Sequence, residues 1–294
     1  MKHTLKITLI LTLVFLIAQI VGLSIINANI DQKASGETGQ AVFNDLPYDM
    51  ERPPIEEQSS FLYIMGAILI GTALVFILIH FRKHNLWKIW FLLAVVMTLA
   101  IAFSAFISST IAFILAAVLA VWKVFKPNPL IHNFTEIFIY GGLAVIFVPI
   151  MNIFSIFMLL ILISIYDMIA VWKSKHMVKM AKFQTNSKVF AGLSIPYEKF
   201  KPGKGSIKIE KKVKTAILGG GDIGFPLLFA GVVMKGLIMQ NGQVTGFLQS
   251  MIIPIVTTIA LFILLTKGKE DRFYPAMPFL SMGCFVGYLI VLIL

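Results

Sequence analysis

Long runs of apolar residues alternate with short polar segments along the whole chain. A helix that crosses the roughly 30 Å hydrocarbon core of a bilayer needs about 20 predominantly apolar residues. Nine runs come near that length, so the pattern predicts an all-α, polytopic membrane protein with nine transmembrane helices, built as one membrane-embedded domain over residues 1–294. The expected helices cover residues 7–26, 61–81, 86–106, 108–125, 134–150, 152–172, 215–238, 245–266 and 275–294.

The first apolar run allows two interpretations. Lys2 and Lys6 precede it, as the basic residues of a secretory signal peptide would. Its length of about 20 residues exceeds the roughly 7–15 apolar residues of such a signal, and no convincing cleavage site between small residues follows it. We therefore expect a retained helix rather than a removed signal.

The charged residues between the runs predict the orientation of the chain. Residues 27–60 include seven acidic and two basic residues, whereas the loop at 173–214 holds twelve lysines and two glutamates. Every alternate connection is basic, and the connections on the opposite side are acidic or short and uncharged. Because positive residues mark the cytoplasmic side, we expect a cytoplasmic N-terminus, a cytoplasmic loop at 173–214 and an extracellular C-terminus.

Composition narrows the functional classes. The chain is 58% hydrophobic and 13% charged, with a formal net charge of +11. Its basic residues cluster between the apolar runs, which indicates anionic lipid at a cell membrane as their partner rather than nucleic acid. The single cysteine, Cys284, excludes a disulfide framework and a cysteine metal site. The histidines lie at helix ends or in basic loops and no HExxH motif is present, so we expect neither a metal nor a cofactor.

Two acidic residues fall well inside the predicted helices. Of the fourteen in the chain, all but three lie in expected loops or termini. Glu136 is expected at the cytoplasmic end of the fifth helix, where water is near and a helix N-terminus favours negative charge. Asp167 in the sixth helix and Asp222 in the seventh remain. An ionisable group at membrane depth is costly and marks a functional site by default.

The two aspartates are expected at similar depths below the cytoplasmic face. Asp167 precedes Lys173 by six residues, and Asp222 follows Lys214 by eight. At about 1.5 Å of rise per helical residue, these separations are roughly 9 Å and 12 Å. The sixth and seventh helices run antiparallel on either side of the cytoplasmic loop, so the two carboxylates can face each other if the helices are neighbours.

A pair of close carboxylates suits one type of chemistry. In low dielectric the two cannot both ionise cheaply, so they share a proton. The ionised member can take a proton from water, while the protonated member polarises a peptide carbonyl and later supplies a proton toward the leaving amine. The pattern therefore favours an aspartic protease, which needs no metal, cofactor or covalent intermediate.

Glycines and prolines surround these positions. Gly219–Gly221 directly precedes Asp222, and Pro275 and Pro278 open the last run. Glycine permits close backbone approach, and irregular backbone at membrane depth is tolerated only against protein or a water-filled cavity. An unwound peptide needs such a place to lie. Taken singly, the glycines fit tight helix packing and the prolines fit an ordinary helix start; the interpretation depends on their combination with the aspartates.

These motifs resemble those of a known family, the presenilin and signal peptide peptidase family of GxGD intramembrane aspartyl proteases. The residues that carry the resemblance are Tyr166-Asp167 in the sixth helix, Gly219-x-Gly221-Asp222 in the seventh, and Pro275-Ala276-Met277 at the start of the ninth. Each motif is weak alone, but their joint placement on membrane helices is specific. The third departs from the family's usual Pro-Ala-Leu; methionine keeps an apolar group there, and the change leaves substrate preference open.

The resemblance implies roles for these residues. Asp167 and Asp222 would be catalytic, and the residues expected to shape the site and bind substrate are Tyr166, Gly219, Gly220, Gly221, Pro275, Ala276 and Met277. Substrates would be single transmembrane segments of other proteins, cleaved after unwinding. The chain is most similar to an archaeal presenilin homologue, which suggests an enzyme with no obligate accessory subunit. A homo-oligomer stays compatible with the sequence.

Two other functions stay open on the residues alone. Paired intramembrane acids also relay protons or bind cations in coupled transporters and ion channels, although the outer half of the predicted helices lacks the further polar groups such a relay needs. The other hypothesis is a membrane scaffold without catalytic activity. Within the basic loop, Ser206–Glu210 alternates polar and apolar residues. We hypothesise that it forms a strand beside bound substrate, although a polar linker explains the pattern equally.

Overall fold

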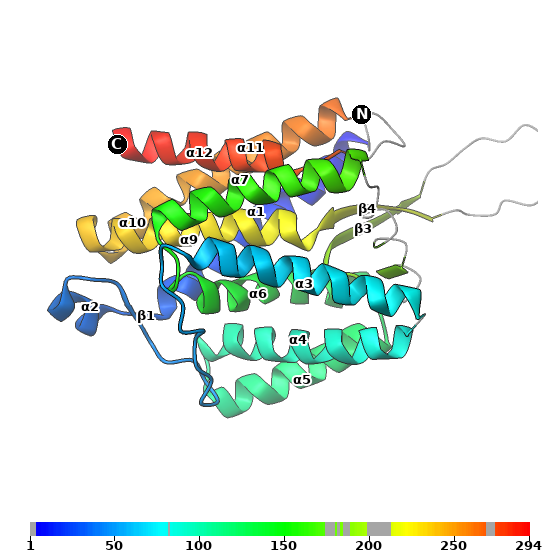
Figure 1. The fold of residues 1–294 in the computed structure, drawn as a ribbon, viewed down its shortest axis with the longest axis horizontal. Helices are drawn as coiled ribbons and strands as arrows, with labels where there is room; N and C mark the ends of the chain where they lie inside the picture. The colour runs from blue at the N-terminus through cyan, green and yellow to red at the C-terminus, as the bar shows by residue number, and fades with distance from the viewer. Residues whose placement is uncertain are drawn as a thin grey trace, which may run out of the picture.

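The structure, a computed structural model, describes residues 4–81, 83–173, 180, 183–184, 189–198, 213–268 and 274–294. Its apolar helices are α1 (Leu5–Ala28), α3 (Ser60–His80), α4 (His84–Ser104), α5 (Ser109–Phe125), α6 (Pro129–Phe147), α7 (Ile153–Met168), α9 (Gly220–Asn241), α10 (Gln243–Ser250), α11 (Ile252–Lys267) and α12 (Met277–Ile293). The smaller elements are α2 (Gln32–Thr38), the π-helical turn η1 (Ile169–Lys173), and the strands β1 (Ile30–Asp31), β2 (Val42–Phe43), β3 (Gly192–Glu198) and β4 (Val213–Gly219). Within the described residues the fold is predominantly helical, as predicted, with two small antiparallel sheets that the all-α prediction does not include (Figure 1).

Each predicted apolar run contains a helix. Across the described ranges, seven helical spans are long and apolar enough to cross a membrane, while α5 and α12 are shorter, at 17 residues each. The eighth run is divided at Met251 into α10 and α11. Pro254 explains the break, because it has no amide proton to donate to the carbonyl of Ser250.

The start of the seventh run differs from its prediction. The sequence predicts a helix from residue 215, but the chain is a strand as far as Gly219, and α9 begins at Gly220. Side chains from Thr215 to Leu218 alternate between exposed and buried, as strand residues do. β4 pairs antiparallel with β3, a strand inside the segment predicted as a loop. A short apolar run fits a helix or a strand equally, and here the pairing with β3 decides. Ser206–Glu210 lies outside the described residues.

α1 lies at the centre of the helix bundle. It contacts α6, α9 and α11, and its side chains Leu11, Phe15 and Leu23 are fully buried. α9 is also interior. In its most apolar stretch of 18 residues, 61% of the residues are buried, against 11% in the corresponding stretch of α3 at the periphery. The helix that carries Asp222 is therefore enclosed by protein.

α7, α9 and α12 contact one another and carry the three predicted motifs. An aromatic cluster fills their junction about two to three helical turns from the motifs. Phe157 of α7 stacks on Phe285 of α12 with 4.7 Å between ring centroids, and it packs edge-on against Phe229 of α9 at 5.1 Å. Each such pair contributes about 0.5–1.5 kcal/mol beyond its buried area. The cluster fixes how the three helices meet, and the polar groups lie beyond it, toward the motifs.

Candidate active site

Asp167 lies in the last turn of α7, and its side chain is buried. The backbone amide of Met277 donates a hydrogen bond to its Oδ2 at 3.0 Å, and the amide of Ala276 donates to the same carboxylate. One helical turn away, the hydroxyls of Ser164 and Ser281 form a hydrogen bond at 2.9 Å. α7 and α12 are thus joined by polar contacts, and the first and third predicted motifs lie together.

Most of the Pro-Ala-Met motif lies just before the last helix. The sequence predicts a helix from residue 275, but α12 begins at Met277 with Ala276 as its N-cap. The first amides of a helix have no partner within it, and the positive end of the helix dipole attracts an anion. The Asp167 carboxylate accepts hydrogen bonds from two such amides, those of Ala276 and Met277. Pro278 occupies the first turn, where a missing amide proton costs nothing.

Asp222 lies in the first turn of α9 and is partly buried. A Cβ at Gly219 would approach Asp222 Oδ2 to 3.3 Å, so the carboxylate folds back over the end of β4. α7 ends, and α9 and α12 begin, at the same end of the bundle, beside the β3–β4 sheet (Figure 1). Asp167, at the end of α7, faces the N-terminus of α12, and Asp222 lies at the N-terminus of α9. Both positions favour a carboxylate, because the N-terminal end of a helix attracts negative charge.

Tyr166, beside Asp167, extends toward α3. Its hydroxyl donates a hydrogen bond to Thr72 Oγ1 at 3.3 Å. α3 contacts α7 and α4 and is otherwise the most exposed of the long helices. Tyr166 thus links the helix that carries Asp167 to the peripheral helix beside it.

Glu136 is buried, contrary to its predicted position near water. α6 begins at Pro129, five residues before the predicted start at 134, so Glu136 lies two turns inside the helix. Asn128 caps this helix through Leu130, with proline at the first position. That Asn-Pro pair is a helix-start signal that the apolar pattern alone misses.

Three donors meet at the Glu136 carboxylate. Lys123 Nζ lies 2.6 Å from Oε1, and the backbone amide of Gly192 donates to Oε2 at 2.9 Å. The hydroxyl of Tyr140 also donates to Oε2. The side chains of Lys123 and Glu136 are 2% and 1% exposed. This buried network connects α5, α6 and β3, and the sequence analysis did not predict it.

Side chains of α6 cover one edge of the β3–β4 sheet. Asn133 donates to the carbonyl of Ser194 at 2.8 Å and accepts from its amide at 2.9 Å. His132 Nε2 lies 2.7 Å from the carbonyl oxygen of Gly192. The backbone groups of Gly192 and Ser194 therefore point away from β4. The opposite residues on β4, Gly219 and Ile217, point their own groups away from β3.

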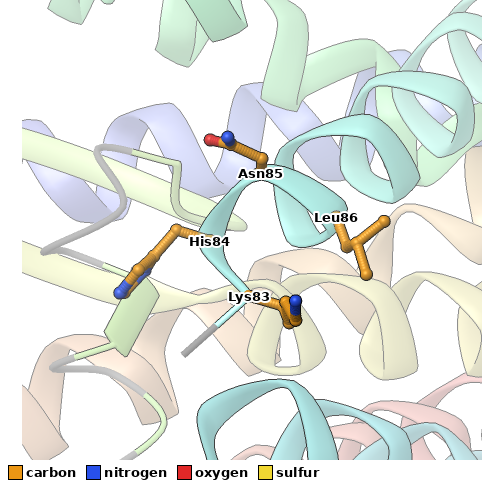
Figure 2. Close-up of a pocket in the computed structure, with 4 residues that line it drawn as sticks. All are labelled: Lys83, His84, Asn85 and Leu86. Carbon is orange, nitrogen blue, oxygen red and sulfur yellow. The ribbon is translucent and has the colours of Figure 1, made fainter. Parts of the chain in front are cut away.

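The pocket drawn in Figure 2 lies apart from this junction. Lys83, His84, Asn85 and Leu86 line it at the start of α4, around a cavity of about 470 Å³. It includes none of the predicted site residues. Among the residues that the structure describes, no group of three His, Cys, Asp or Glu side chains could hold a metal ion.

Comparison with known proteins identifies relatives in sequence and in fold. The family described as signal-peptide peptidase, presenilin aspartyl protease matches residues 40–294. Two solved structures of a presenilin family intramembrane aspartate protease, in space groups C222 and P2, are similar in fold. The first has a TM-score of 0.61 and 14% identity over 95% of this chain and 94% of its own. The second has a TM-score of 0.59 and 16% identity over 96% of each chain. No curated protein sequence matches the chain.

Proposed function

The chain belongs to the signal-peptide peptidase and presenilin aspartyl protease family, and we propose that Asp167 and Asp222 are its catalytic pair. It is a multi-pass membrane protein and an aspartic endopeptidase of the intramembrane type. Its substrates are transmembrane segments of other proteins. One observation carries the proposal: two carboxylates, one facing the N-terminus of α12 and one in the first turn of α9, lie at the same end of a junction of three mutually packed helices.

The reaction is hydrolysis by a pair that shares one proton. The ionised carboxylate takes a proton from water as the water oxygen attacks the carbonyl carbon of the scissile bond, and the protonated carboxyl gives its proton to the carbonyl oxygen. The resulting gem-diol loses a proton to a carboxylate as the C–N bond breaks, and the amine nitrogen takes up a proton from the other carboxyl. One water is consumed, and the dyad returns to its starting protonation.

An unwound substrate could pair with the outer edge of β4. α6 side chains cover the β3 edge, and β4 is the second strand of a two-stranded sheet within the described residues. Thr215, Ile217 and Gly219 point their backbone groups away from β3, as the register requires. An extended peptide that pairs with them gains main-chain hydrogen bonds and lies next to Asp222.

The remaining parts of the proposal concern topology and assembly. α5 and α12 cross the bilayer together with the seven longer spans, which gives nine crossings of the cell membrane. The N-terminus and the β3–β4 end then face the cytoplasm, and the C-terminus faces outside. The enzyme works without an accessory subunit, as a monomer or a homo-oligomer.

Purified protein in proteoliposomes with a fluorogenic single-span peptide tests the catalytic pair. Asp167→Asn and Asp222→Asn keep the side-chain shape but remove the ionisable group, so each should lower kcat by about 10²–10⁴-fold. Asp45→Asn, the same exchange at an exposed position, should leave kcat unchanged. Cleavage at the wild-type rate by either of the first two variants, with intact folding, contradicts the proposal. Absence of cleavage by the purified wild type contradicts the stand-alone enzyme.

A further inference from the structure

The buried ion pair between Lys123 and Glu136 lies outside the catalytic pair and its motifs. Burying two charges costs several kcal/mol per ion before their attraction is counted, and a well-packed apolar pair is often no less stable. Stability alone is therefore a weak reason for this pair. Its contacts reach further: Glu136 Oε2 accepts from Tyr140 and from the amide of Gly192. Both donors contact the segment that carries Asp222.

The first path runs through the small sheet. Gly192 is the first residue of β3 and lies opposite Gly219, the last residue of β4. The amide of Gly220 continues the pairing by donating to the carbonyl of Ala191 at 3.2 Å. A shift of Gly192 away from Glu136 therefore moves the end of β4, three residues before Asp222.

The second path runs through the ring of Tyr140. A Cβ at Gly220 would lie 2.7 Å from the Tyr140 hydroxyl oxygen, and one at Gly224 would lie 3.5 Å from Cδ1 of its ring. The ring thus packs directly against the first turn of α9, on both sides of Asp222 in sequence. The hydrogen bond to Glu136 fixes the ring, because it holds the hydroxyl end in one position.

We propose that Glu136 is a positioning residue for Asp222. Its carboxylate anchors Gly192 and Tyr140 together, and these hold the backbone of residues 219–224 at two points, so that the Asp222 side chain is presented at a fixed place and angle. Lys123 holds the Glu136 carboxylate in place through its 2.6 Å contact with Oε1. The inference rests on the proposed function, since it assigns a role through Asp222.

The magnitude follows from the sensitivity of catalysis to geometry. A misplacement of about 1 Å in a catalytic group costs up to about 100-fold in rate. Tyr140→Phe removes one of the two contacts that position residues 219–224, and Glu136→Gln weakens both. We therefore expect kcat to fall about 10-fold in Tyr140→Phe and up to about 100-fold in Glu136→Gln. KM should change little in Tyr140→Phe, because the ring packs against α9. Glu136→Gln should also raise KM, because it frees Gly192, which lies opposite Gly219 at the proposed substrate edge of β4.

The experiment compares Tyr140→Phe, Glu136→Gln and Tyr288→Phe in proteoliposomes. Tyr288→Phe is the matched control: it removes the same hydroxyl from the aromatic cluster of the α7–α9–α12 junction, about three helical turns from Met277. Active enzyme is counted by titration with a peptide inhibitor that carries a tetrahedral alcohol in place of the scissile amide. For each variant kcat, KM and the inhibition constant of this analogue are measured.

A positioning role predicts that the inhibition constant rises in step with the fall in kcat/KM, because transition-state complementarity is what is lost. A purely structural role lowers the amount of active enzyme and leaves both constants of the folded fraction unchanged, which overturns the proposal. If Glu136→Gln does not fold, Tyr140→Phe decides alone. Failure of the wild type to cleave, or cleavage by Asp222→Asn, overturns the proposed function instead.

Discussion

A single amide on α1 supports the backbone next to Asp222. Gln19 is fully buried, and its Nε2 donates to the carbonyl of Ile223 at 2.8 Å. The start of α9 is weak, because Pro226 cannot donate to the carbonyl of Asp222 four residues earlier. Gln19 thus adds a hydrogen bond from another helix where the ladder of α9 is incomplete.

Gln19→Leu should therefore lower the free energy of unfolding by about 0.5–1.5 kcal/mol, the net contribution of one intramolecular hydrogen bond, and should reduce kcat. Thermal unfolding in detergent micelles and the peptide-cleavage assay measure the two effects. Ser24→Ala is the control on the same helix, since its exposed hydroxyl donates to the carbonyl of Ile20 in its own turn. Equal melting temperatures for the two variants contradict this role of Gln19.

At the residue scale, the sequence reveals carboxylates that are rare within apolar runs, but it does not reveal side chains whose partners lie far away in the chain. Asp167 and Asp222 are conspicuous because few carboxylates fall within apolar runs. Glu136 also falls within an apolar run, but the predicted helix start at residue 134 places it near water. Its burial depends on Lys123 and on Gly192, which is 56 residues away in the chain. Gln19 likewise acts on a carbonyl 204 residues away. Such partners follow from tertiary packing and leave no mark in local patterns.

At the scale of elements, the hydrophobic pattern predicts the helices but not the small sheet. Each long apolar run fixes a helix by its length, whereas Val213–Gly219 is short enough to suit a strand or a helix. β4 exists because β3 supplies its hydrogen bonds, and β3 in turn is held by α6. The strand changes the geometry before Asp222, because extended residues rise about 3.3 Å each against 1.5 Å in a helix.

Strand addition at β4 predicts a specific effect of proline. Ile217→Pro removes an amide that points away from β3, so the β3–β4 ladder stays intact while a bond to substrate is lost. We expect kcat/KM for a transmembrane peptide to fall about 10-fold, the equivalent of one or two net hydrogen bonds. Ile217→Ala, which shortens the exposed side chain but keeps the amide, serves as the control. Equal kcat/KM for the proline and alanine variants rules out pairing at this edge.

At the scale of the whole molecule, charge and packing divide the bundle into two ends. The acidic segment with β1, α2 and β2 lies at the end opposite β3 and β4 (Figure 1). The turn between α5 and α6, which includes Lys126, lies at the β3–β4 end, because Asn133 near the start of α6 bonds to Ser194. Positive residues prefer the cytoplasmic side, so this division favours an active site that opens toward the cytoplasm.

Single cysteines test this orientation in intact cells. The native Cys284 is buried, and Cys284→Ala provides a background without it. Gly36→Cys introduces a thiol with open space around it on the acidic side, and Lys126→Cys introduces an exposed thiol on the opposite side. A membrane-impermeant maleimide should label the first variant in intact cells and the second only after permeabilisation. Peptide cleavage by each variant verifies the fold. Labelling of Lys126→Cys in intact cells reverses the proposed topology, and it would place the catalytic end outside the cytoplasm, where the basic connections could not contact the anionic inner leaflet.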